Sequence, residues 1–132
     1  MGYTLVDTSV WIDVLAGRHS DPALRCLGLL ESAEPVALTD IIYTELLQGL
    51  RSDREARLLD EHLRAFPILR LSTLDDFSLA AQLYRQARRR GLTIRKTLHC
   101  LIAAPCVRTN APLLHADADF DRLASCTALR IY

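Results

Sequence analysis

Short apolar runs alternate with longer amphipathic segments along the chain, and this pattern predicts strands and helices in turn. The expected strands cover residues 3–6, 36–38, 67–69, 112–115 and 129–131. The expected helices cover residues 10–16, 22–33, 41–50, 52–65, 74–90, 95–109 and 118–124. Strands this short and apolar are typical of a sheet buried on both faces. The pattern therefore predicts an α/β fold, a three-layer sandwich with a short parallel central sheet.

Two helix boundaries in this scheme depend on particular residues. Asp21 is expected to cap the helix over residues 22–33, with Pro22 in the first turn. Pro105 falls inside the helix expected from Arg95 to residue 109. Because proline has no backbone N–H, it should kink that helix or remove the hydrogen bond of one turn.

The composition restricts the possible classes of protein but does not indicate a function. A chain of 132 residues, half of them apolar, can form one domain over residues 1–132 with a real core. Its formal net charge is zero, so no overall field attracts a nucleic acid, and any such contact needs a local basic patch. The four cysteines form no CxxC pair, which favours buried thiols in a reducing compartment over a zinc site or disulfides. With no leader-like or membrane-length apolar run, we expect a soluble cytoplasmic protein without membrane contact.

Carboxylates stand where parallel sheets bind ligands. Asp7 directly follows the first expected strand and Asp117 the fourth, so both should project from the carboxyl edge of the sheet. Glu45 lies in the helix after the second strand, and Asp119 and Asp121 follow Asp117 at alternate positions. Several convergent carboxylates suit Mg²⁺ or Mn²⁺, and phosphodiester hydrolysis can use such an ion.

Each acid also has a plainer interpretation. Asp7 could only cap the following helix, Glu45 could only face solvent between apolar neighbours, and residues 117–121 could form a solvated acidic turn. A response-regulator receiver domain has a similar length and acids at strand ends. It needs an acid doublet after the first strand and a lysine late in the chain, whereas the only lysine here is Lys96.

Three segments taken together resemble a known family. They are residues 6–13 (VDTSVWID), 43–51 (YTELLQGLR) and 113–121 (LLHADADFD). In this order and spacing they look like a PIN domain, and more narrowly like the VapC-type ribonuclease toxin of a type II toxin–antitoxin system. The resemblance runs almost from end to end of the chain, and it implies an endoribonuclease that depends on Mg²⁺ or Mn²⁺.

The resemblance also implies roles for particular residues and partners. Asp7, Glu45 and Asp117 match the metal-binding acids of the family, and Asp119 matches an additional acid that is often present. The implied partners are a structured RNA, such as a transfer or ribosomal RNA, a second copy of the chain, and a VapB-type antitoxin. The C-terminal segment of that antitoxin would cover the acidic site.

His99 is the departure from the family pattern. In residues 93–103 (TIRKTLHCLIA) it stands where the related motif has aspartate. A neutral imidazole offers one nitrogen ligand and no negative charge, and it suits zinc, copper or nickel better than magnesium. The substitution could attenuate a toxin, change its metal preference, or mark a degenerate domain that only binds its antitoxin.

We therefore predict a ribonuclease of the VapC type, weakened by His99. The alternative is a non-catalytic PIN module that binds the cognate antitoxin. The expected catalytic set is Asp7, Glu45, His99, Asp117 and Asp119. The candidate substrate-binding residues are Thr8, His115 and Arg95, the last of which could hold a phosphate together with Lys96.

Overall fold

A four-stranded parallel sheet forms the centre of the molecule, in a computed structural model that describes residues 2–132. The strands are β1 (Thr4–Val6), β2 (Val36–Thr39), β3 (Ile68–Leu69) and β4 (Leu113–Leu114), in the order β3-β2-β1-β4. Leu5 of β1 lies opposite Ala37 of β2 on one side and Leu113 of β4 on the other. All residues of β1, β2 and β4 are buried, which explains why these strands are continuous apolar runs. The predicted α/β class is confirmed.

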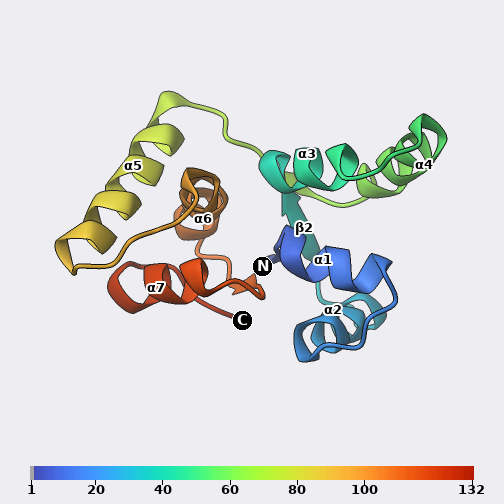
Figure 1. Cartoon of the computed structure of the whole chain (residues 1–132), viewed down its shortest axis with the longest axis horizontal. Helices are drawn as coiled ribbons and strands as arrows, with labels where there is room; N and C mark the ends of the chain where they lie inside the picture. The colour runs from blue at the N-terminus through green and yellow to red at the C-terminus, as the bar shows by residue number, and fades with distance from the viewer. Residues whose placement is uncertain (1) are drawn as a thin grey trace.

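Within residues 2–132, seven helices cover this sheet. They are α1 (Thr8–Leu15), α2 (Asp21–Glu31), α3 (Asp40–Gln48), α4 (Asp53–Leu63), α5 (Leu74–Arg89), α6 (Thr97–Thr109) and α7 (Ala118–Cys126). The chain steps from β1 to β2 to β3 in one direction, then returns past β1 to β4. Because parallel crossovers are right-handed, the helices before and after this return cover opposite faces. Figure 1 shows α1 to α4 gathered on one side and α5 to α7 on the other.

The reversal of direction places a crevice between β1 and β4. In open parallel sheets, ligands bind beyond the carboxyl ends of the strands at this switch point. Asp7 follows β1 at once, and Asp117 lies three residues after the end of β4. The topology therefore brings together two acids that are 110 positions apart in the chain (117 − 7).

Several predicted boundaries need correction. The N-cap of α2 is Ser20, not Asp21, because the Ser20 hydroxyl accepts the Ala23 N–H while Asp21 lies in the first turn. Helix α6 begins at Thr97 rather than Arg95. It continues through Pro105 to Thr109, the predicted end of this helix. The strand expected at residues 129–131 is only a single bridge between Ile131 and Leu113.

The buried cysteines match the prediction. All four thiols are free, and Cys26, Cys100 and Cys106 are buried. Burial raises the pKa of Cys26 and of Cys100 to about 11, so both remain protonated at neutral pH and are poor metal ligands. Within residues 2–132, no helix combines the length and apolar character needed to cross a membrane.

Candidate active site

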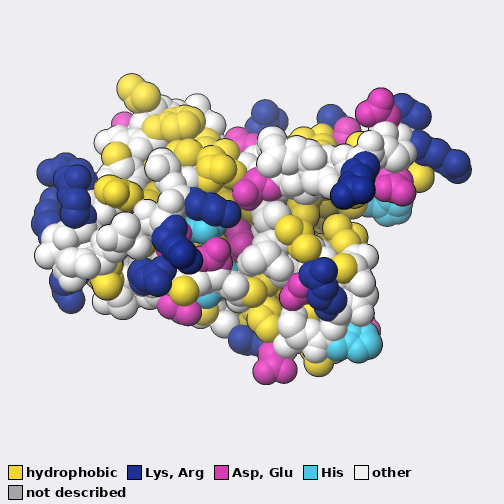
Figure 2. All heavy atoms as spheres, in the orientation of Figure 1, with side chains coloured by type: hydrophobic (Ala, Val, Ile, Leu, Met, Phe, Trp, Pro, Cys, Tyr) yellow, Lys and Arg dark blue, Asp and Glu magenta, His cyan; other side chains and the backbone are white. Residues whose placement is uncertain are grey.

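A small polar groove opens at the crevice between β1 and β4, with a volume of about 170 Å³. The residues that line this acidic groove are Asp7, Thr8, Ser9, Ile12, Glu45, Lys96, His99 and Asp117. Figure 2 shows acidic and histidine side chains gathered where the two groups of helices meet, with basic side chains beside them. Asp7, Glu45 and Asp117 therefore converge, although they come from three separate segments.

Asp7 is both a helix cap and a buried carboxylate with a free oxygen. Its Oδ2 accepts hydrogen bonds from the Ser9 N–H (3.0 Å) and the Ser9 hydroxyl (2.6 Å), which caps α1. The residue is only 3% exposed, and its Oδ1 has no hydrogen-bond partner. An unpaired buried carboxylate oxygen is costly. The two oxygens therefore differ, because Oδ2 caps α1 whereas the buried Oδ1 has no hydrogen-bond partner.

Glu45 reaches the groove from α3 and is held by Thr8. The Thr8 hydroxyl donates to Glu45 Oε1 at 2.7 Å, which joins α1 to α3 across the groove floor. This hydrogen bond restrains a long, flexible side chain. Thr8 lines the groove, and its observed contact orients an acid; the predicted contact of Thr8 with substrate stays a prediction.

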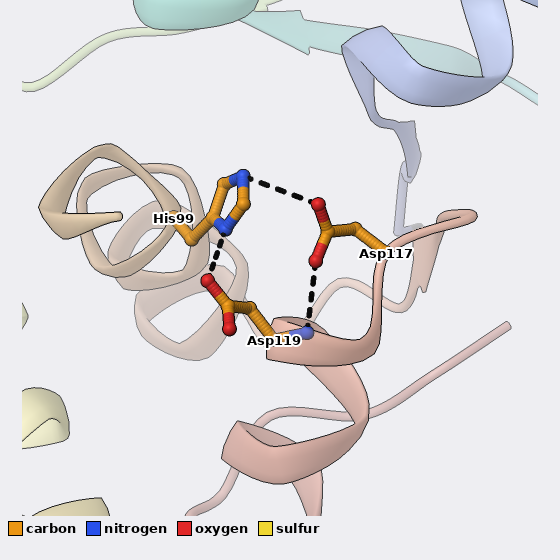
Figure 3. Close-up of side chains that lie close together, drawn as sticks. All are labelled: His99, Asp117 and Asp119. Carbon is orange, nitrogen blue, oxygen red and sulfur yellow. Dashed lines mark hydrogen bonds and ion pairs between the residues drawn. The ribbon is translucent and has the colours of Figure 1, made fainter. Parts of the chain in front are cut away.

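Asp117 is the N-cap of α7, and neighbouring groups fix its position. Its Oδ1 accepts the Asp119 N–H at 2.9 Å, while Oδ2 lies 3.8 Å from His99 Nε2 (Figure 3). The backbone N–H of Asp117 donates to His115 Nδ1 at 3.0 Å. Because Nδ1 accepts there, Nε2 of His115 carries the proton and donates to Asp121 at 3.1 Å. His115 thus supports Asp117 from outside the groove lining.

Asp119 has a different environment, although it is only two residues from Asp117. It is fully buried, outside the groove lining, and accepts N–H groups from four residues. These donors are the backbones of Arg95 and Lys96, the guanidinium of Arg122 and the ring of His99. Burial raises the pKa of Asp119, but the hydrogen bonds from His99, Arg95 and Lys96 outweigh it and hold the pKa below 3.8. Asp119 is therefore a buried anion.

His99 connects the two aspartates. Its Nδ1 lies 2.7 Å from Asp119 Oδ2, and an ionised carboxylate can only accept, so Nδ1 carries the proton. Nε2 then faces Asp117 and the groove (Figure 3). The ring packs on Phe120 with a centroid separation of 4.8 Å. His99, Asp117 and Asp119 each offer a ligand atom within 4.8 Å of the others.

Comparison with known proteins agrees with this architecture. The PIN domain family matches residues 4–125, nearly the whole chain. This chain belongs to the PIN-domain family. Its PIN domain is 38% identical over 127 residues to ribonuclease VapC11 of Mycobacterium tuberculosis, covering 96% of this chain and 95% of that protein.

Solved structures share the fold of this PIN domain. DNA-bound VapBC from Salmonella typhimurium is similar with a TM-score of 0.77 and 16% identity, over 100% of this chain and 98% of that one. VapBC2 from Rickettsia felis, bound to a DNA fragment from its promoter, gives a TM-score of 0.74 and 21% identity, over 100% and 98% of the two chains.

Two residues of the PIN-domain site, Ser9 and Arg122, did not stand out from the sequence. Ser9 binds Asp7 and also accepts the Ala116 N–H at 3.1 Å, so it joins the two acidic segments. Its position two residues after an N-cap could have indicated the first of these contacts. Arg122 lies three positions after Asp119 in α7, a spacing typical of helical ion pairs. Arg95 does not line the groove, whereas Lys96 does.

Proposed function

We propose that this PIN domain is a divalent-metal-dependent endoribonuclease toxin of a toxin–antitoxin pair. The observation that carries the proposal is the convergence of Asp7, Glu45 and Asp117 on one groove, where Asp7 Oδ1 is buried without a partner. An oxygen-lined site with an unpaired anionic oxygen fits a hard divalent cation. The curated relative VapC11, named a ribonuclease, supports the same reaction.

Asp7, Glu45 and Asp117 would hold Mg²⁺ or Mn²⁺ in this groove. The bound ion would supply charge neutralisation at the phosphate and a more acidic water for hydrolysis. Thr8 keeps Glu45 turned toward the groove, and His115 fixes the backbone of Asp117. These contacts reduce the reorganisation needed when an RNA phosphate arrives.

Lys96 is the cation best placed to bind that phosphate. It lines the groove, whereas the exposed side chain of Arg95 is outside the lining. A lysine ammonium attracts a phosphate as a point charge, and Arg95 could contact the next phosphate along a strand. Exposed Arg88, Arg89 and Arg90 at the end of α5 add a second basic cluster, visible at the left of Figure 2.

We also propose a VapB-type antitoxin and a second copy of this chain as partners. Both structural neighbours described above are VapBC toxin–antitoxin assemblies, which supports the first partner. Two apolar hollows offer suitable surfaces. One, of about 340 Å³, lies between α1, α3 and α4 around Trp11 and Phe66. The other, of about 540 Å³, lies between α5 and α6 around Phe77 and Tyr84. The target would be a structured RNA in the cytoplasm.

His99 favours a second candidate, a non-catalytic PIN module that only binds the antitoxin. The imidazole at this position brings no negative charge to the groove, and its Nδ1 is committed to Asp119. A groove with one carboxylate fewer binds a hard cation less tightly. An attenuated ribonuclease lies between these two candidates.

Cleavage of a structured RNA by the purified chain, with Mg²⁺, with Mn²⁺ and with EDTA, tests the proposal. Asp117→Asn should reduce metal-dependent cleavage by about 100-fold or more. This loss is larger than the usual cost of removing a residue that only orients a metal ligand. Glu61→Gln, an exposed acid on α4, is the matched control and should leave the rate unchanged.

Three outcomes separate the candidates. Cleavage that survives EDTA or Asp117→Asn contradicts the metal-dependent mechanism. Cleavage that appears only in His99→Asp identifies an attenuated enzyme. If neither chain cleaves RNA but both bind the antitoxin, the protein is a binding module.

A further inference from the structure

His99 offers the groove a nitrogen whose direction is fixed by its neighbours. Its side chain is 8% exposed and is held between the Phe120 ring and the Asp119 carboxylate. Asp119 accepts the Nδ1 proton, so in the neutral ring Nε2 keeps its lone pair and faces Asp117. A histidine that ligates a metal generally donates its second ring N–H to a carboxylate or carbonyl in this way.

The gap between His99 and Asp117 has the size of a shared ion. His99 Nε2 lies 3.8 Å from Asp117 Oδ2. A direct hydrogen bond would bring these atoms to about 3 Å. Two metal–ligand bonds of about 2.0–2.1 Å each can span up to about 4.2 Å. The observed separation is thus too long for a good hydrogen bond but within reach of two ligands of one cation.

Asp119 supports His99 rather than competing with it for the ion. All its oxygens already accept N–H groups, and it lies outside the groove lining. The free thiol of neighbouring Cys100 is buried and does not line the groove either. The groove therefore presents one imidazole nitrogen that faces Asp117, and Asp7 belongs to the same lining.

A charged imidazolium that replaces the cation is the competing interpretation. It would also explain why both ring nitrogens face carboxylates. However, His99 lies in the first turn of α6, where the positive end of the helix dipole disfavours a positive charge on the His99 ring.

We propose that the acidic groove is a mixed nitrogen–oxygen metal site, with His99 Nε2 as a ligand, and that it prefers transition metals to Mg²⁺. Asp119 is the positioning residue that orients the imidazole. Imidazole suits zinc, copper, nickel and iron, whereas Mg²⁺ prefers oxygen and retains its waters. Of the two ions considered for catalysis, the site would favour Mn²⁺. The inference rests on the proposed function for the location of the metal, and goes beyond it in the ligand set and the selectivity.

Histidine nitrogen NMR on the intact chain, with Zn²⁺ as a diamagnetic probe, tests the ligand directly. The chain has four histidines, so each ring can be assigned by substitution. Without metal, His99 should show a proton on Nδ1 only. With Zn²⁺, the Nε2 resonance of His99 should shift while Nδ1 keeps its proton. The shift should disappear in Asp117→Asn.

Calorimetric titration with Zn²⁺ and with Mg²⁺ tests the selectivity. His99→Asp should lower the ratio of Zn²⁺ to Mg²⁺ affinity at least tenfold, because it exchanges a nitrogen for carboxylate oxygens. Asp119→Asn should weaken Zn²⁺ binding by about 10- to 100-fold, the usual cost of losing a partner that orients a ligand. His19→Asn, an exposed histidine in the loop after α1, is the control and should change neither affinity. If Asp119→Asn does not fold, His99→Asp still decides the question.

Three results would overturn the inference in distinguishable ways. If both ions bind and need Asp117, but the His99 resonances do not move, the ligand set is wrong and the proposed function survives. If neither this chain nor His99→Asp binds any ion at the groove, both proposals fail. A His99 ring protonated on both nitrogens at neutral pH, unchanged by Zn²⁺, would support the imidazolium interpretation instead.

Discussion

The two walls of the acidic groove contain similar residues but treat them differently. The α1–α3 wall carries Asp7, Thr8 and Glu45, and the α6–α7 wall carries His99, Asp117 and the buried Asp119. On the first wall, Asp7 Oδ1 has no hydrogen-bond partner. On the second wall, both oxygens of Asp119 are occupied by N–H donors. The role of an aspartate here depends on the number of N–H groups around it.

This difference indicates where each wall obtains positive charge. The α6–α7 wall neutralises its buried anion internally, through α6, Arg122 and His99. The α1–α3 wall leaves the buried Oδ1 of Asp7 without an internal donor, and we propose that a bound cation supplies the positive charge there. Substitution of the buried Asp119 should therefore affect mainly stability, whereas substitution of Asp7 should affect mainly metal-dependent activity.

Asp119→Ala should produce the largest effect. It leaves the backbone N–H groups of Arg95 and Lys96 and the charge of Arg122 without their partner. Breaking a buried charged network of this kind costs about 3–5 kcal/mol of unfolding free energy. Urea denaturation measures it. Asp121→Ala on the same helix, with a side chain 70% exposed, should change stability by only about 0–1 kcal/mol. If Asp119→Ala and Asp121→Ala lower the unfolding free energy equally, the buried network of Asp119 does not stabilise the α6–α7 wall as proposed.

Asp7→Asn should separate activity from stability on the α1–α3 wall. The amide oxygen can still accept from Ser9 and cap α1, so the unfolding free energy should change by about 1 kcal/mol or less. Loss of the anionic oxygen should reduce metal-dependent RNA cleavage by about 100-fold or more. Cleavage kinetics and thermal melting measure the two quantities. A large loss of stability with unchanged cleavage would reverse the proposed roles of the walls.

Thr8→Val should also reduce metal-dependent RNA cleavage, but by less than Asp7→Asn does. It removes the hydroxyl that holds Glu45 Oε1 at 2.7 Å and keeps the shape of the side chain. One hydrogen bond to a charged group is worth about 1.5–3 kcal/mol, so cleavage should fall by roughly tenfold or more. Thr8→Ser retains a hydroxyl and should restore most of the rate. If Thr8→Ser and Thr8→Val have equal rates, Thr8 does not act by orienting Glu45.

Asp13→Asn should produce the smallest effect, since Asp13 is on α1 but outside the groove lining. Hydrogen bonds from Ser20 and Arg18 hold the pKa of Asp13 below 3.8. A lowered folded-state pKa gives stability that is present above 3.8 and lost as the pH falls through the folded value. The small difference in melting temperature between the two chains at pH 7 should therefore vanish in acid. A difference that grows in acid would contradict this sign.

The order of elements and the position of three acids could be predicted from local patterns. Apolar periodicity depends on neighbours within one turn or one strand, so it is visible in the sequence. The convergence of Asp7 and Asp117 followed from one general rule, that parallel strands end at a common edge. Helix starts were less predictable. Arg95 fits the helical pattern, but its N–H and that of Lys96 bind Asp119, and α6 begins only at Thr97.

The sequence by itself therefore determined the α/β class, the family and the acids that reach the groove, because these depend on local periodicity and on motif order. Only the tertiary structure decided the different roles of Asp117 and Asp119. Both follow the same strand, but Asp119 accepts N–H groups from Arg95, Lys96 and His99, which lie 20 or more positions earlier in the chain. The same contact turns His99 Nε2 toward the groove. Such roles depend on which donors the fold brings within 3 Å or so of a carboxylate, and no local pattern contains that information.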